Sequence, residues 1–216
     1  MNISNPGLGF ASYGSGADAL GPSDAEANNS LTVVSLGDGG RITLTFARPI
    51  ANGPGADFAV FENGITDNFL ELAFVEVSSD GTNFTRFHAV SLTQTATQVG
   101  PFDQSIDPTD LYNLAGKYRV GFGTPFDLAE LVGTPGLDIN AVTHVRIVDV
   151  VGSIDPLYGT RDSLNNLIND PWPTAFDTGG FDLDAVGVLN FAPVPEPSSI
   201  VLLAAAALCA AVRRRR

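Results

Sequence analysis

Cysteine is almost missing from this chain of 216 residues, which has a single one at position 209. Because Cys209 lies in an apolar run near the C-terminus, the rest of the chain has no disulfide and no catalytic thiol. A domain of this kind draws its stability from its hydrophobic core, with bound metal as a further contributor. Histidine is equally scarce, since His88 and His144 stand far apart and neither lies in a metal motif such as HExxH.

Motifs of the common enzyme classes are also missing. The sequence has no GxSxG nucleophile elbow, no phosphate-binding Walker loop and no dinucleotide fingerprint. We therefore expect a non-catalytic protein. A carboxylate-based glycan hydrolase stays open as a less favoured alternative, because that chemistry needs only two acids and the chain has 24.

Basic residues are rare before the C-terminal tail. Seven of the eleven Lys and Arg residues precede position 194, against 23 of the 24 Asp and Glu residues. A surface with this balance repels nucleic acid and anionic lipid, and it favours cations or neutral partners. Nucleic-acid binding is therefore not expected.

The N-terminus lacks the features of a secretory signal peptide. Residues 1–6 contain neither a basic n-region nor an apolar h-region. Because the C-terminal region calls for export, we expect the true signal to lie upstream, with the gene start misplaced or the chain truncated. In the less favoured interpretation the protein stays inside the cell.

The C-terminal tail has three parts in a fixed order, which are the tripeptide Pro195, Glu196, Pro197, an apolar run at 200–212, and the basic end Arg213, Arg214, Arg215, Arg216. The thirteen apolar residues span about 20 Å as a helix, less than the about 30 Å of a bilayer core. A short transmembrane helix that is processed after use fits this length better than a permanent anchor. Arginine clusters stay cytoplasmic, so the preceding domain is expected outside. The alternative is a buried or amphipathic helix of a soluble domain.

The tail resembles the PEP-CTERM sorting signal of Gram-negative bacteria. That resemblance implies recognition by exosortase, a protease-transpeptidase of the inner membrane, followed by residence at the cell surface or in the extracellular matrix. It also implies a host that makes extracellular polysaccharide. The expected organisation is an irregular lead-in at 1–30, a β-sandwich at 31–192, a Pro-rich linker at 193–199, a sorting helix at 200–212 and a cytoplasmic tail at 213–216.

The body shows the pattern of an all-β domain. Polar and apolar residues alternate at 41–46, and residues 57–62 are apolar on both faces, as in a central strand. Two hairpins are predicted, one joining 31–36 to 41–46 and one joining 73–79 to 83–87. Residues 69–76 are less clear as a unit. Further strands are expected at 117–122, 144–151 and 183–189, and short helical turns at 109–115 and 126–131.

These elements predict an antiparallel β-sandwich of jelly-roll type. The stretches 53–63 and 180–186 resemble those of a group of bacterial cell-surface proteins. The last strand is similar to that of jelly-roll galactose-binding and carbohydrate-binding modules, where an acid just before a valine holds a structural calcium. The resemblance implies a fold and a location without implying an activity.

Acids near the ends of strands are the candidate metal ligands. Asp182 and Asp184 stand two apart, so a regular strand places them on the face shared by Val186 and Val188. We expect them to hold a structural Ca²⁺, helped by oxygens of the acid-rich loops at Asp155, Asp162, Asn165, Asp170 and Asp177. Weaker candidates are Asp57, Glu62 and Asp149. In the alternative interpretation these acids accept backbone amides or cap loops.

Aromatic residues in loops are the candidate sugar contacts. Trp172 and Tyr158 lie in the long loop 152–180, and Tyr112 and Phe176 are further candidates for stacking on a pyranose ring. Trp172 could equally plug the open end of the sandwich. The favoured function is an exported binding module for extracellular polysaccharide or an envelope component, and the alternative is structural matrix cargo without a specific ligand.

Overall fold

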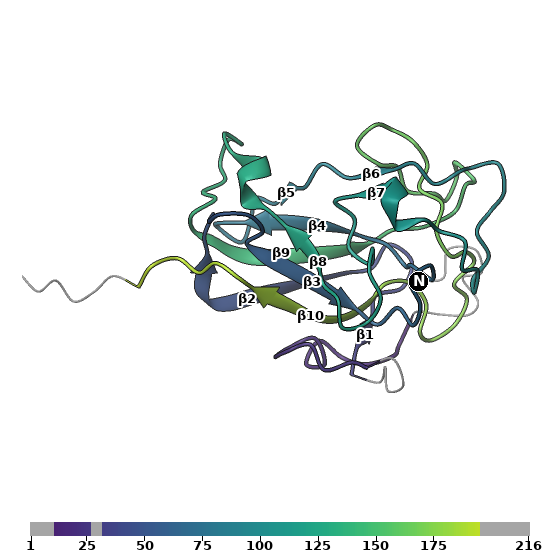
Figure 1. The fold of residues 1–216 in the computed structure, drawn as a ribbon, viewed down its shortest axis with the longest axis horizontal. Coiled ribbons are helices and arrows are strands. Elements are labelled where there is room, and N and C mark those ends of the chain that lie inside the picture. Colours follow the sequence, from purple (N-terminus) through teal and green to yellow (C-terminus); the bar gives the residue numbers. More distant parts are fainter. Residues whose placement is uncertain (1–10, 27–31, 195–216) are drawn as a thin grey trace, which may run out of the picture.

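The computed structural model describes residues 11–26 and 32–194, which form two four-stranded antiparallel sheets (Figure 1). The first sheet has the order β1 (Val34–Ser35), β10 (Asp182–Val188), β3 (Phe58–Glu62), β8 (Thr124–Phe126). The second has the order β2 (Arg41–Ile50), β9 (Val142–Asp149), β4 (Ala73–Ser78), β5 (Thr85–Arg86). A small ribbon pairs β6 (Val90–Ser91) with β7 (Leu111–Tyr112), and two 3₁₀ turns are present, η2 (Pro108–Asp110) and η3 (Leu128–Leu131). The predicted all-β, antiparallel fold is confirmed.

The main core lies between the two sheets. Phe58 and Val60 of β3 face Val75 of β4 and Ile147 of β9 across the sandwich, because alternate residues of each strand point inward. The ring of Phe58 stacks on that of Phe126 with centroids 5.5 Å apart. A core of this size stabilises a domain that has no disulfide.

A second cluster of apolar side chains covers the outer face of the second sheet. Leu70, Leu72 and Phe74 point away from the main core and pack under the long loops 92–110 and 152–181. Figure 1 shows these loops gathered at one end of the sandwich. The loops therefore belong to the folded unit and shape that end.

The predicted hairpin between 31–36 and 41–46 is wrong. Val34 pairs with Leu183 of β10 in the first sheet, whereas residues 41–45 pair with β9 in the second. The Gly-rich turn between them crosses from one sheet to the other, and its Gly39 amide donates to the carboxylate of Asp149 at 2.8 Å. The residue pattern of 31–46 alone cannot predict this long-range contact.

The predicted strand at 117–122 is also wrong, because this segment turns instead of pairing. Gly116 and Gly121 have φ of 83° and 84°, and the nearby strand is β8. The hairpin of β4 and β5, the central position of β3, the strands β9 and β10 and the helical turn η3 agree with the prediction. The helical turn predicted at 109–115 ends at Asp110, because Leu111–Tyr112 form β7.

The predicted sorting helix at 200–212, the PEP tripeptide and the terminal arginines lie outside the described residues. In the part of the chain that is described, no helix combines the length and the apolar character needed to cross a membrane.

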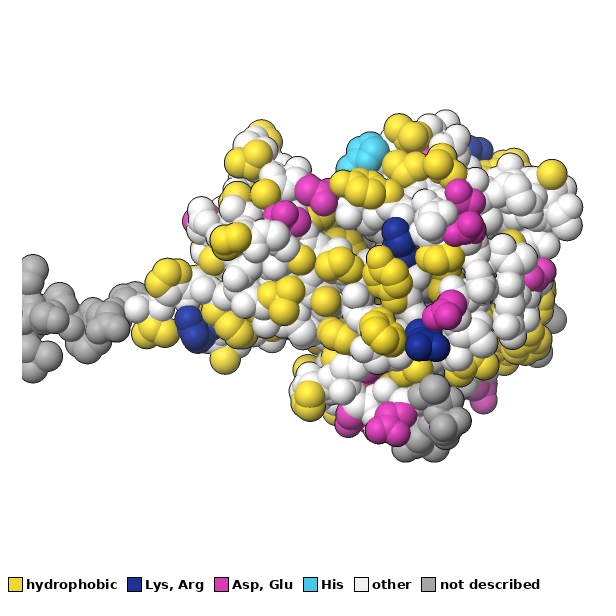
Figure 2. All heavy atoms as spheres, viewed as in Figure 1, with side chains coloured by type: hydrophobic (Ala, Val, Ile, Leu, Met, Phe, Trp, Pro, Cys, Tyr) yellow, Lys and Arg dark blue, Asp and Glu magenta, His cyan; other side chains and the backbone are white. Residues whose placement is uncertain are grey.

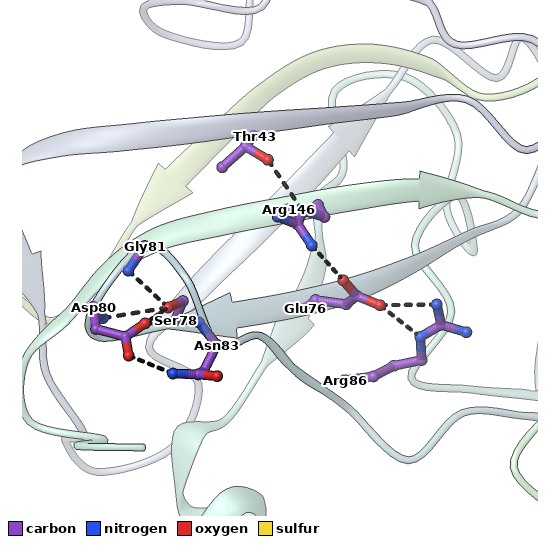
Figure 3. Close-up of polar contacts among 8 residues, drawn as sticks. All are labelled: Thr43, Glu76, Ser78, Asp80, Gly81, Asn83, Arg86 and Arg146. Atoms are coloured by element: carbon purple, nitrogen blue, oxygen red, sulfur yellow. Dashed lines mark hydrogen bonds and ion pairs between the residues drawn. The ribbon is translucent and has the colours of Figure 1, made fainter. Parts of the chain in front are cut away.

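Two arginines flank Glu76 on the outer face of the second sheet (Figure 3). Glu76 Oε1 accepts from Arg86 Nη2 at 2.8 Å, and Oε2 lies 3.4 Å from Arg146 Nη1. The guanidinium groups also lie over the rings of Phe74 and Phe84, at 4.1 and 3.3 Å from the centroids. This network joins three adjacent strands.

Glu76→Gln is expected to lower the free energy of unfolding by about 1 kcal/mol at low salt and by less at high salt, because screening weakens the two ion pairs. Urea denaturation at both salt levels measures it. Asp67→Asn is the control, since the pair of Asp67 with Arg119 is exposed and should contribute almost nothing. A loss that is equal at both salt levels would contradict an ionic origin.

Candidate functional site

Acids stand at inward positions where strands reach one end of the sandwich. In β3 the inward residues are Phe58, Val60 and then Glu62, and in β9 they are Val145, Ile147 and then Asp149. The apolar core therefore ends in carboxylates at this edge. Glu62 and Asp149 are both buried, with exposed fractions of 1% and 3%.

Glu71, in the segment that precedes β4, is a further acid on the inner side of the sandwich. Leu70 and Leu72 point into the outer cluster, so the alternation turns Glu71 toward the inner side together with Ala73. Asp170 joins from the long loop, where its Oδ2 accepts from the Leu72 amide at 3.0 Å. With Asp182 at the start of β10, these residues form what we call the acid layer: Glu62, Glu71, Asp149, Asp170 and Asp182.

A cavity of about 190 Å³ opens beside the acid layer. Glu71 and Asp182 line it, and the rings of Phe102 and Phe176 contribute to its wall with centroids 5.4 Å apart. Both rings are exposed, Phe102 to 72%. We call this the acid cavity, because it gives otherwise buried carboxylates a path to solvent.

The three aspartates of the acid layer accept hydrogen bonds from amides or hydroxyl groups. Asp149 accepts from the amides of Gly39 and Phe181, the latter at 2.7 Å. Asp170 accepts from Leu72, as described above. Asp182 accepts from the Ser35 hydroxyl and, at 3.3 Å, from Asn63 Nδ2. For these acids the interpretation as amide and hydroxyl acceptors has direct support.

The two glutamates of the layer differ from the aspartates. Glu62 Oε2 accepts from the Gly64 amide at 2.7 Å, but the buried Oε1 has no hydrogen-bond partner among residues 11–26 and 32–194. The side chain of Glu71, 7% exposed, forms no hydrogen bond with the residues that the structure describes. Oxygens of this kind remain available to a ligand.

Burial raises the pKa of Glu62, Glu71, Asp149 and Asp170 well above the ordinary carboxyl value, and in each case the negative charge of a neighbouring acid raises it further. Burial also raises the pKa of Asp182 to about 6, although its hydrogen bonds act in the opposite direction. Within residues 11–26 and 32–194, the ion pairs join Arg86 and Arg146 to Glu76 and Arg119 to Asp67, so none reaches the acid layer.

Asp184 has hydrogen-bond partners outside this layer, although its charge still raises the pKa of Glu62, and its predicted face is wrong. The pairing of β10 with β3 shifts between Leu183 and Ala185, so Asp184 occupies a bulge. As a result Leu183, Val186 and Val188 pack toward the core, and the two acids do not share their face. Asp184 instead accepts from the Ser23 hydroxyl and from two amides of the N-terminal segment.

Asp57 is fully buried at the opposite end of β3 from Glu62. Its Oδ1 accepts from the Gly53 amide at 2.7 Å and from Asn190 Nδ2 at 2.9 Å, and its Oδ2 accepts from the Leu128 amide at 2.8 Å. The carboxylate thus joins three separate segments. Its predicted metal role stays a weaker hypothesis.

Of the loop residues expected to help bind calcium, Asp170 belongs to the acid layer with Asp182, and the others have different surroundings. Asp155 and Asp162 accept amides of their own loops, and Asn165 adopts a positive φ of 68° in the same turn as Asp162. The backbone oxygen of Asp177 accepts from Ser12 and Tyr13. In the described ranges, no three His, Cys, Asp or Glu side chains are grouped closely enough to enclose a metal ion as they lie.

A second cavity, of about 260 Å³, contains aromatic and polar side chains together. Tyr112, half exposed at 51%, and Tyr118 line it with Lys117, Asp127 and Glu130. Glu130 Oε2 accepts from the Tyr112 hydroxyl at 3.1 Å and from Asn113 Nδ2. We call this the tyrosine groove.

The predicted sugar contacts Trp172 and Tyr158 stand next to each other, with ring centroids 6.4 Å apart. Trp172 is buried, with 9% exposed, and its amide donates to the Val99 carbonyl, whereas Tyr158 is exposed. This burial agrees with the interpretation of Trp172 as a plug. Of the further candidates, Tyr112 lies in the tyrosine groove and Phe176 at the acid cavity.

The sequence interpretation missed Glu71, the acid cavity and the tyrosine groove. The pattern that could have indicated the acid layer is an acid at the next inward position after two apolar ones, which occurs in β3 and again in β9. Lys and Arg appear on the face drawn in Figure 2 as separate residues, without forming a basic patch.

Comparison with known families adds information on the C-terminal tail. The family model of the PEP-CTERM protein-sorting motif matches residues 193–216, which include the tripeptide, the apolar run and the basic end. A comparison with curated proteins finds no significant match. The matched motif supports an exported protein that is directed to the cell surface and sorted by exosortase. The chain therefore carries a PEP-CTERM protein-sorting motif at its C-terminus.

Proposed function

We propose that the chain is a cell-surface or matrix protein whose jelly-roll sandwich binds polysaccharide without catalysis. The observation that carries this proposal is the tyrosine groove. Tyr112 and Tyr118 offer exposed ring faces beside the polar groups of Lys117, Asp127 and Glu130. Sugar sites use this combination, because the ring faces contact C–H groups while the polar groups fix the hydroxyls.

The charge of the domain restricts the ligand class. Before residue 194 acids outnumber bases by 23 to seven, and an anionic polymer would be repelled. A neutral glycan fits the groove and the surface around it. Transient membrane anchoring by residues 200–212, with Arg213–Arg216 on the cytoplasmic side, completes the proposal for the route to the surface.

Tyr112→Ala and Tyr118→Ala are each expected to weaken binding to a soluble neutral glucan about tenfold, the loss of roughly 1.4 kcal/mol of stacking. Isothermal titration calorimetry with the full chain in a mild detergent measures the dissociation constant. Tyr158→Ala is the matched control, because Tyr158 is equally a tyrosine with an exposed ring and lies outside the groove.

Two results would contradict the tyrosine groove as the binding site. Loss of binding in Tyr158→Ala and Trp172→Ala, with Tyr112→Ala unchanged, would place the ligand on the long loop. Absence of binding in the unaltered chain, tested over several neutral glycans, would favour structural cargo without a specific ligand.

A glycan hydrolase remains the second candidate, because one observation favours it. Glu71 and Asp182 line the same cavity, and burial raises the pKa of both, as in a general acid. Release of reducing ends from a neutral glucan, lost in Glu71→Gln, would support catalysis. We expect no release.

A further inference from the structure

The acid layer contains more carboxylates than its surroundings can neutralise. Five acids lie within one end of the core, and in the described part of the chain none of them has a basic partner. A buried carboxylate without a cation is costly, and the cost grows when others stand nearby. Each of these acids must therefore either hold a proton or face a bound cation.

An independent observation points to a ligand. Glu62 is 99% buried, shares the inner side of the sandwich with Glu71, and has one oxygen without a hydrogen-bond partner in the part of the chain that the structure describes. Asp182 is the acid whose charge acts most strongly on both glutamates. The unpartnered oxygen of Glu62 therefore lies close to the carboxylates of Glu71 and Asp182.

The acid cavity supplies access from solvent. It holds about 190 Å³ and is lined by Glu71 and Asp182, so an ion can reach these two side chains without unfolding the core. Asp182 keeps free lone pairs although Ser35 and Asn63 donate to it, because a carboxylate can accept about four hydrogen bonds or metal contacts. Glu62 does not line the cavity, but its charge raises the pKa of Glu71, so Glu62 lies close to this pair.

We propose that the acid cavity binds one Ca²⁺, with Glu71 and Asp182 as carboxylate ligands and Glu62 as the supporting charge. Calcium prefers oxygen ligands, accepts irregular geometry and completes its shell with carbonyls and water, which suits two carboxylates at a solvent-accessible cavity. Magnesium demands closer octahedral geometry and fits this arrangement less well. The site differs from the predicted pair, since Asp184 is bound by the N-terminal segment.

Titration of the full chain with CaCl₂ is expected to show one site with a dissociation constant of about 0.1–1 mM, as in extracellular calcium modules. Saturating calcium should raise the thermal midpoint by about 5–10 °C relative to chelator. Calorimetry measures the binding, and circular dichroism follows unfolding and verifies that each variant is folded.

Glu71→Gln and Glu62→Gln keep the shape of the side chain and remove its charge. Glu71→Gln is expected to weaken calcium binding at least tenfold and Glu62→Gln to weaken it severalfold, and each should reduce the thermal shift. Glu130→Gln is the matched control, because it changes a glutamate in the tyrosine groove and should leave the calcium affinity unaltered.

Three results would overturn the calcium site. They are the absence of a saturable site in the unaltered chain, equal calcium affinity in Glu71→Gln, and weak binding of several ions that Glu130→Gln reduces as much as Glu71→Gln does. The inference stands apart from glycan binding, because calcium alone is the probe and the tyrosine groove is altered only in the control.

Discussion

Replacing Asp57 with alanine is expected to lower the free energy of unfolding by about 3–6 kcal/mol. The change leaves the amides of Gly53 and Leu128 without an acceptor, and it removes one of the two acceptors of Asn190 Nδ2, which keeps the Ala56 carbonyl. Each buried donor that loses its partner costs about 1–3 kcal/mol. Since domains are stable by about 5–15 kcal/mol, this one carboxylate accounts for a large part of the total.

Asp57→Asn keeps the experiment informative if the alanine variant does not fold. Its amide oxygen can still serve Gly53 and Asn190, but its NH₂ group then faces the Leu128 amide, so a loss of about 1–3 kcal/mol is expected. Urea denaturation with calcium and with chelator measures both variants. A loss that appears only with calcium would mean that Asp57 binds metal instead of joining segments.

The metal-free protein is expected to be more stable at pH 5 than at pH 8. Burial raises the pKa of Asp149 and Asp170 above the unfolded-state value of 3.8, so the folded state holds protons that the unfolded state has released. Stability from these groups is complete below the unfolded-state pKa and is lost as the pH rises through the folded-state pKa. Each pKa unit corresponds to about 1.4 kcal/mol.

Exposed acids change the pH dependence of stability in the opposite direction, but only at lower pH. The pKa values of Asp80 and Asp107 are lowered by hydrogen bonds, so their contribution disappears as the pH falls below the usual carboxyl range. Maximum stability is therefore expected at mildly acidic pH.

Urea denaturation in chelator between pH 4 and pH 8 tests the sign of the slope. Asp170→Asn keeps an acceptor for the Leu72 amide and should flatten the slope, whereas Asp67→Asn, an exposed control, should leave it unchanged. Stability that rises with pH over this range would contradict the protonation of the acid layer.

The local sequence pattern predicts those strands in which the alternation of apolar and polar residues is regular along the whole strand. The apolar faces of 57–62 indicate a central strand and the pattern of 144–151 indicates a strand, and both are inner strands of a sheet. The same patterns could not assign 31–36 and 41–46 to different sheets, because the contact between Gly39 and Asp149 spans more than a hundred residues. The alternation of side chains shows which face of a strand is buried, but it does not show which other strand it pairs with.

The candidate site could be predicted only in part for the same reason. The sequence indicates Glu62 and Asp149 as separate metal candidates and Asp182 as a partner of Asp184, each from its own strand. Glu71 was not named, because residues 69–76 lack a clear period and its inward direction depends on Leu70 and Leu72 packing under distant loops. The bulge at Asp184 likewise follows from pairing with β3 and separates two acids that a regular strand would align.

Strand β2 runs from one end of the sandwich to the other. Its first residue, Arg41, follows Gly40, whose carbonyl accepts from the Asp149 amide, and its last, Ile50, bridges to Phe191 just before the chain continues to the sorting motif. Ten residues of strand extend about 30 Å. Figure 1 shows the described chain leaving at the end opposite the long loops. A protein tethered through its C-terminus would therefore carry the acid cavity at the end of the domain that lies far from the point where the described chain leaves it.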